Sequence, residues 1–185
     1  MISKSFGLLR EIKTSELELI RGWRNRDDVR LNMYGRHEIT KPEHHAWWES
    51  LKSSKDKKYF IYESMDGNAV AVVYFTQINR KDKNAFWGFY LGDCAAKGVG
   101  AFVEYVAVDY AFNVLGLHKL NCEVLAFNIP VLKMHAKFGF ENEGVFREQH
   151  LYDDSYIDIC RLGILKSDWV SCSKMMYKRL CKLIK

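Results

Sequence analysis

The chain has 185 residues, of which 48% are hydrophobic and 28% are charged, and it contains only two prolines. This length and balance predict one globular domain over 1–185 and exclude a disordered arm, a linker or a low-complexity protein. The net charge of +5 favours an anionic partner, but it does not choose among nucleic acid, a nucleotide cofactor, a nucleotide-linked substrate and a membrane surface.

The five cysteines are widely spaced and form no CxxC motif, so neither a zinc site nor a redox motif is expected. Their usage is typical of reduced thiols in the cytosol. The stretch from Met1 to Phe6 lacks the apolar core of a signal peptide, and no apolar run approaches the length of a membrane span. We therefore expect a cytoplasmic protein without a membrane span or a metal centre.

The N-terminal part predicts a strand over 6–12 and a helix over 15–26, with Leu17, Ile20 and Trp23 on one helical face. Residues 40–43 form a capping box with a proline in the first turn, which predicts the start of a second helix. One stripe of this second helix carries His44, Trp47, Trp48 and Leu51.

The central part predicts strands over 59–63, 69–79 and 85–91, because these segments are rich in β-branched and aromatic residues. Asp66-Gly67 is typical of a hairpin turn between the first two. A long apolar helix is expected over 98–115, where Gly116 would end it as a C-cap.

The C-terminal part predicts a strand over 118–125, a short helix over 128–137 and a hairpin of two strands over 138–149 and 156–165. A possible amphipathic tail helix follows over 170–185, and it could pack on the domain or on a second subunit. The whole order indicates a mixed α/β (α+β) fold around a mostly antiparallel sheet, not a doubly wound parallel sheet.

Gly98-Val99-Gly100 follows the aromatic strand and opens the long helix. Glycines allow a phosphate to approach the backbone closely, and the free amides at a helix N-terminus point toward an anion. This turn therefore favours binding of a pyrophosphate, in a gap between strands 85–91 and 118–125. Many strand–helix turns carry glycines for steric reasons alone, so the pattern by itself is weakly specific.

The strand order, the glycine turn and the segment from Asn128 to Phe140 together resemble the GNAT superfamily of N-acetyltransferases. The resemblance covers nearly the whole chain. It implies the GNAT fold, with helices on both faces of the sheet and a splayed pair of strands that holds acetyl-CoA as cosubstrate, without a metal. Where that family usually carries Gln or Arg before the glycine turn, this chain has Ala95.

Within the superfamily, the chain is most similar to the N-acetyltransferases of pseudaminic-acid biosynthesis. The segments that carry this similarity are 23–30, Met33-Tyr34, His44 with Trp47 and Leu51, 87–93, 117–124 and 138–144. N-terminal acetyltransferases of ribosomal proteins share much of the second half, and the segment Trp23-Arg24-Asn25 separates the two groups. The similarity implies acetyl transfer to the C4 amine of a UDP-linked 4-amino-4,6-dideoxy sugar.

The resemblance implies three catalytic positions. A backbone amide of Tyr90 or Leu91 would stabilise the thioester oxygen. Glu123, a carboxylate in an apolar strand, would line the cleft and accept the amine proton, unless it lies on a solvent face. His135 stands where the family often has a tyrosine that protonates the thiolate of coenzyme A; otherwise it is a surface histidine on a short helix.

The same resemblance assigns residues to the two ligands. Cofactor contacts are expected from Leu91, Ala96, Lys97, Gly98, Val99, Gly100, Ala101, Asn128 and Lys137. Acceptor contacts are expected from Arg24, Met33, Tyr34, His44 and Trp47. Arg24 and His44 would bind the diphosphate, and the others would form an apolar wall for the deoxy sugar. Without the resemblance, His44 is a packed side chain, Asn128 a simple helix cap and Lys137 a solvated lysine.

The sequence thus predicts an acetyl-CoA-dependent N-acetyltransferase with a nucleotide-linked aminosugar as substrate. The alternatives are an acetyltransferase of protein N-termini and a non-catalytic protein that keeps the fold and binds coenzyme A. No nucleic-acid partner is expected, since the basic residues are scattered and are not interleaved with aromatic residues. A homodimer is possible.

Overall fold

The computed structural model describes residues 5–93 and 95–184. Cys94 and the last residue of the expected tail helix lie outside these ranges. Seven strands form one sheet in the order β1-β2-β3-β4-β5-β7-β6. Their bounds are β1 Leu8–Glu11, β2 Lys58–Glu63, β3 Ala69–Asn79, β4 Asn84–Leu91, β5 Lys119–Leu125, β6 Glu141–Tyr152 and β7 Ser155–Leu165. Only β4 and β5 pair in parallel, which confirms the mixed, mostly antiparallel sheet.

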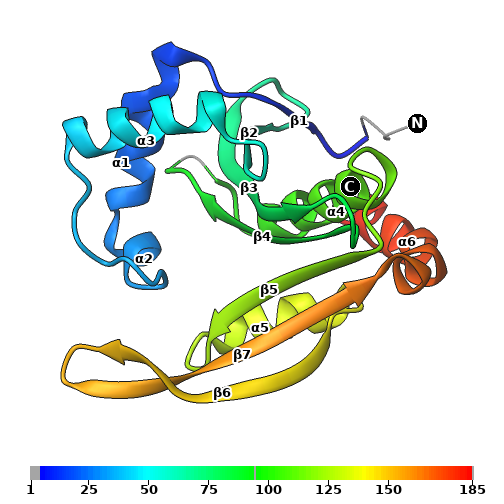
Figure 1. Ribbon diagram of the computed structural model, residues 1–185. Coiled ribbons are helices and arrows are strands. Elements are labelled where there is room, and N and C mark those ends of the chain that lie inside the picture. The colour runs from blue at the N-terminus through cyan, green and yellow to red at the C-terminus, as the bar shows by residue number, and fades with distance from the viewer. Residues whose placement is uncertain (1–4, 94, 185) are drawn as a thin grey trace.

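Helices cover both faces of this sheet (Figure 1). Their bounds are η1 Thr14–Glu16, α1 Leu17–Asn25, α2 Asp27–Arg30, α3 Lys41–Ser53, α4 Val99–Asn113, α5 Ile129–Lys137 and α6 Lys166–Cys181. Side chains from α1, α2 and α3 pack on one face, and side chains from α4, α5 and α6 pack on the other. Strand alternation separates these two cores, because Phe60 and Val73 point to the second face while their neighbours Ile61 and Val72 point to the first.

The pairing between β4 and β5 is short. It comprises Asn84 with Lys119, Ala85 with Leu120 and Phe86 with Asn121, after which the two strands separate. The buried amide of Asn121 donates to Ala85 O at 3.1 Å and so closes the paired end. Figure 1 shows β4 and β5 close together near α6 and diverging away from it. The expected parting of these two strands is confirmed.

Helix α4 runs along this parted sheet and is buried on most of its circumference, as expected for an apolar helix. Gly98 caps its N-terminus with a φ of 90°, and Gly116 follows its C-terminus with a φ of 67°. L-residues other than glycine rarely adopt such angles. The predicted helix boundaries are therefore correct to within two residues.

Two local expectations differ from the structure. The first helix begins with the 3₁₀ turn η1 and is followed by α2, because Arg26 leaves the helical region with a ψ of 142°. The last helix begins at Lys166, before the expected start, since Asp168 accepts the Leu165 N–H at 3.0 Å and Trp169 is buried. Within that helix Met176 and Leu180 are buried, whereas Leu183 and Ile184 beyond it are exposed.

The four described cysteines, Cys122, Cys160, Cys172 and Cys181, are free thiols. In the described part of the chain, no helix combines the length and the apolar character that a bilayer crossing requires.

Gly92 provides a test of how closely α1 is packed on the sheet. A Cβ at this position would overlap the indole of Trp23, whereas a Cβ at Gly22, on the exposed side of α1, would touch nothing. We expect Gly92→Ala to lower the free energy of unfolding by about 1–3 kcal/mol in urea titrations. Gly22→Ala, the matched control, should be neutral or stabilise by at most about 1 kcal/mol. Equal effects of the two substitutions would contradict this packing.

Candidate active site

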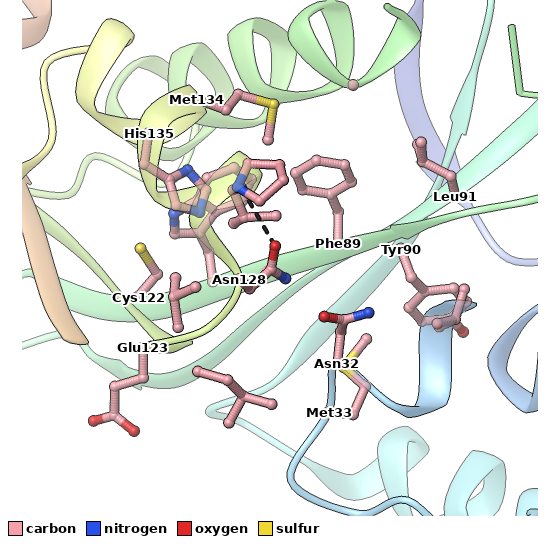
Figure 2. Close-up of a pocket in the computed structure, with 18 of the residues that line it drawn as sticks. Asn32, Met33, Phe89, Tyr90, Leu91, Cys122, Glu123, Asn128, Met134 and His135 are labelled. Carbon is pink, nitrogen blue, oxygen red and sulfur yellow. Dashed lines mark hydrogen bonds between the residues drawn. The ribbon is translucent and has the colours of Figure 1, made fainter. Parts of the chain in front are cut away.

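A cavity of about 470 Å³ occupies the gap that opens between β4 and β5. Its walls come from β4, β5, α5, the first turn of α4 and the segment around α2. In Figure 2, Asn32 and Met33 lie on one side of this cavity, and Met134 and His135 lie on the other. Of the residues singled out from the sequence, the cavity is lined by Met33, Tyr34, Tyr90, Leu91, Gly100, Glu123, Asn128 and His135.

The backbone of β4 supplies amides to this cavity. Gly92 N–H donates to Val70 O at 2.8 Å, and the register with β3 continues without a shift from there to Phe86. Residues of an antiparallel ladder alternate between hydrogen-bonded and non-hydrogen-bonded pairs. Tyr90 therefore directs its amide to β3, whereas Leu91 and Phe89 direct theirs toward the gap. This corrects the expectation for the Tyr90 amide, and it adds the amide of Phe89, which was not among the expected positions.

The first turn of α4 faces the same gap through Gly100. A Cβ at Gly100 would lie 3.6 Å from Met134 Sδ and 3.7 Å from the ring of Phe89. Because glycine lacks this atom, the space between Phe89 and Met134 stays open. Val99 and Ala101 use their amides internally, donating to Ala96 O at 3.1 Å and Gly98 O at 3.2 Å. The expected anion contacts of Ala96, Lys97, Gly98, Val99 and Ala101 lie outside the lining of the cavity, at the helix end that leads into it.

Asn128 caps α5 and also lines the cavity. Its Oδ1 accepts the Val131 N–H at 3.4 Å, the bond drawn as a dashed line in Figure 2. Its Nδ2 donates to no described residue, so one side chain can both cap the helix and donate to a ligand. Lys137, at the opposite end of α5, is exposed and does not line the cavity, which matches a solvated lysine.

Glu123 joins two side chains across the cavity mouth. Its carboxylate accepts the Tyr34 hydroxyl at 2.7 Å and the Arg161 guanidinium at 3.1 Å. Burial and the carboxylate of Glu123 raise the pKa of Tyr34, so this phenol stays protonated and donates. Arg161 in turn lies 4.0 Å above the ring of Phe86. The carboxylate thus lines the cleft, as expected, with an arginine that balances its charge.

His135 is buried and lies against the rings of Trp87 and Phe140, with centroids 5.5 and 5.1 Å away. Its Nδ1 is 2.7 Å from Oε1 of Glu104, a carboxylate with no exposed surface. Burial alone would lower the pKa of His135, but its hydrogen bonds to Cys122 and Glu104 outweigh burial and raise the pKa to about 10. The interpretation as a surface histidine is therefore wrong.

The segment after α2 is fixed across the cavity mouth to the β6–β7 hairpin. Arg36 donates to Asp153 at 2.6 Å and lies 3.8 Å above the ring of Tyr152. The hydroxyl of Tyr152 donates to Leu31 O at 3.3 Å. Tyr34 also packs edge-on against His150, with ring centroids 5.1 Å apart. Residues 31–36 therefore form one side of the entrance.

Three expected acceptor contacts lie outside this cavity. His44 is buried, stacks on Trp47 at 4.8 Å and has its pKa lowered by burial, so it is a neutral packed side chain. Trp47 packs edge-on against Tyr59. Arg24 lies behind the cavity wall, near the hydroxyls of Tyr74 and Tyr90, which belong to that wall.

The environment of Arg24 is unusual for a cation. Nη2 donates to Gly35 O at 2.6 Å, next to Tyr34 at the entrance, while Nη1 is buried without a hydrogen-bond partner in the described residues. Burial lowers the pKa of this guanidinium, and no described carboxylate pairs with it. An unpaired buried donor is costly, so this position favours a further acceptor.

Glu104, Cys122 and Arg161 are the main residues that sequence reasoning missed. Glu104 had a visible signal, since it is the one acidic residue in the first three turns of an apolar helix. Cys122 and Arg161 had none, because their roles arise from strand pairing, which brings Arg161 opposite Glu123 and sets Cys122 beside α5.

A family model described as an acetyltransferase (GNAT) domain matches residues 9–160. "Probable N-acetyltransferase YjcK" of Bacillus subtilis is 32% identical over 65% of this chain and 67% of its own length. "Acetyltransferase PseH" of Campylobacter jejuni is 30% identical over 70% and 80%. A spermidine N(1)-acetyltransferase of Vibrio cholerae is 26% identical over 64% and 69%.

The fold has close counterparts among solved structures. A spermidine N-acetyltransferase from Vibrio cholerae, crystallised with CoA and spermine, superposes with a TM-score of 0.83 over 90% of this chain and 99% of that chain, at 22% sequence identity. Together with the family model, these similarities show that the chain belongs to the GNAT acetyltransferases.

Proposed function

We propose that this protein transfers the acetyl group of acetyl-CoA to the C4 amine of a UDP-linked 4-amino-4,6-dideoxy sugar. The observation that carries the choice of acceptor is the charge balance around the cavity. Four carboxylates near its entrance are paired with arginines, whereas Arg24, behind the wall, has no anionic partner among the described residues. The similarity to Acetyltransferase PseH supports the same choice.

The donor side suits acetyl-CoA. The positive φ of Gly98 and the small Gly100 give a pyrophosphate access to the N-terminus of α4, a helix of 15 residues. From there the passage between Phe89 and Met134 leads into the parted strands, where an extended pantetheine arm could pair with the amides of Phe89 and Leu91. Asn128 would add a side-chain amide to that pairing.

The chemistry needs an oxyanion donor, a neutral amine and a proton for the leaving thiolate. The Leu91 or Phe89 amide would stabilise the thioester oxygen, since neither is used by the β3 ladder. Glu123 would receive the amine proton, directly or through water, while the Tyr34 hydroxyl holds its Oε2. His135 would protonate the sulfur from the opposite wall.

The acceptor side is rich in arginine. Asp28 pairs with Arg26 at 2.5 Å, and Asp153 pairs with Arg36 at 2.6 Å. Asp27 and Glu123 are likewise paired with arginines. A polyamine acceptor needs free carboxylates, whereas a nucleotide diphosphate needs free cations. Spermidine is nonetheless the acceptor named for several relatives, so it belongs in the test.

The acceptor can be identified with the purified protein, acetyl-CoA and separate amines, by following thiol release. We expect rapid release with the UDP-linked 4-amino-4,6-dideoxy sugar and only background release with spermidine or with peptides that begin with Ala or Ser. The product should carry the acetyl group on the C4 nitrogen by NMR. Faster turnover of spermidine or of a peptide would reject the aminosugar assignment.

Replacing Arg24 tests the diphosphate contact. A hydrogen bond to a charged group contributes about 1.5–3 kcal/mol, so Arg24→Gln should raise KM for the nucleotide sugar roughly tenfold to a hundredfold. KM for acetyl-CoA should stay unchanged. Arg21→Gln on the same helix is the control, because Arg21 bonds to Ile39 O and Glu18 away from the cavity. An unaltered KM for the nucleotide sugar would show that Arg24 does not contact the acceptor.

Replacing Glu123 tests whether this residue acts as a base or only lines the cavity. If Glu123 takes the amine proton, Glu123→Gln should lower kcat by roughly a hundredfold with little change in KM for either substrate. Glu141→Gln on exposed β6 is the control and should have no effect. A rise in KM at constant kcat would leave Glu123 only the role of holding Tyr34.

A further inference from the structure

Glu104 is a carboxylate in a place where the fold does not need one. It belongs to α4, it has no exposed surface, and its neighbours in the helix are apolar core residues. Ionised groups are expensive to bury unless they are paired. Its Oε1 lies 2.7 Å from Nδ1 of His135, while its Oε2 has no hydrogen-bond partner among the described residues. The contact that this carboxylate makes is therefore the one with His135.

The surroundings of His135 contain few titratable groups. From α4 it meets Glu104, and from β5 it meets the thiol of Cys122. The rings of Trp87 and Phe140 also pack against it. Glu104 holds Nδ1, and His135 and Cys122 both line the cavity. Figure 2 shows Cys122 beside the His135 ring.

Both members of the buried pair hold protons more tightly than usual. Burial raises the pKa of Glu104, and the pKa of His135 is raised to about 10 because its hydrogen bonds outweigh burial. The pair therefore keeps a proton on His135 at neutral pH, where a free histidine has largely lost its own.

We propose that Glu104 is a positioning residue that fixes the imidazole of His135 and keeps its Nε2–H directed into the cavity as the proton donor for the departing thiolate. This rests on the proposed function, since it takes a thioester as the acetyl donor. The contact with Cys122 places a sulfur atom next to His135, which is the arrangement that the leaving sulfur would also need.

The step balances without a further reactant. The amine nitrogen forms a bond to the acetyl carbon, the carbon–sulfur bond breaks, and its electron pair remains on sulfur. The Nε2 proton moves to that sulfur, and the proton lost by the amine leaves through Glu123 or water. Glu104 stays ionised as His135 gives up its proton, and the imidazole regains one from solvent when the products leave.

The experiment compares Glu104→Gln with the wild type in two measurements. NMR titration of the His135 ring, without any acceptor, should show no protonation change in the wild type between about pH 5 and 8, and a titration near the ordinary histidine range in the variant. Turnover is measured with the amine that is acetylated fastest, and His135 must be protonated to act as the acid. Wild-type kcat should therefore persist through neutral pH and fall only as the pH rises toward 10.

In Glu104→Gln that fall should move to lower pH, with kcat at least about tenfold lower near pH 8 and the affinity for CoA unchanged. Asp109→Asn is the control, since it removes a carboxylate from the same helix, where Asp109 bonds to Trp169 and Asn113. It should leave the pH profile unaltered. His135→Gln should abolish the fall of kcat at high pH, both in the wild type and in Glu104→Gln.

An unshifted profile in Glu104→Gln would overturn the proposal. So would a wild-type His135 that titrates like a free histidine, which decides the question even if the variant does not fold. The NMR measurement uses no acceptor, so a wrong acceptor assignment leaves its outcome unchanged, and failure of the two proposals can be told apart.

Discussion

The structure depends on how few positions of β4 and β5 pair with each other. β4 and β5 pair at three positions and then separate, while β4 remains paired with β3 from Phe86 to Leu91 and β5 remains paired with β7 along its whole length. Each strand is therefore held from its far side, and the gap persists without loss of the sheet. The backbone groups left along the gap are the reason that an extended ligand can lie there, because unpaired buried amides require a partner.

The two walls of the gap carry opposite chemistry. On the α4–α5 side, Glu104 and His135 form a pair in an apolar core that retains a proton. On the other side, Glu123 meets Tyr34 and Arg161 near solvent. In the proposed reaction, this separation would place a proton donor and a proton acceptor on either side of the reacting carbon. The segment 31–36 is held at one side of the entrance through Arg36 and Tyr152.

Much of the site could be predicted where a local pattern specifies it. The glycine turn and the cap at Asn128 follow from short motifs, and the family resemblance singled out Glu123. The structure brings Gly100, Asn128 and Glu123 to one cavity. The role of His44 was misjudged, because a histidine on one face of a helix gives the same sequence pattern whether its side chain packs in the core or binds a ligand. Its burial depends on how α3 packs on the rest of the domain, which no local pattern encodes.

Most of the elements and their order could be predicted from local patterns, since periodicity, caps and turn residues act over a few positions, and the family was predicted from the resemblance of the motifs. Which amide faces the gap could not be predicted in this way, because it follows from the register between β3 and β4. The tertiary structure also sets the contact of Glu104 with His135, 31 positions away, and leaves Arg24 without an anionic partner in the described part of the chain. These are long-range contacts, set by the packing of whole helices on the sheet and not by any neighbouring residue.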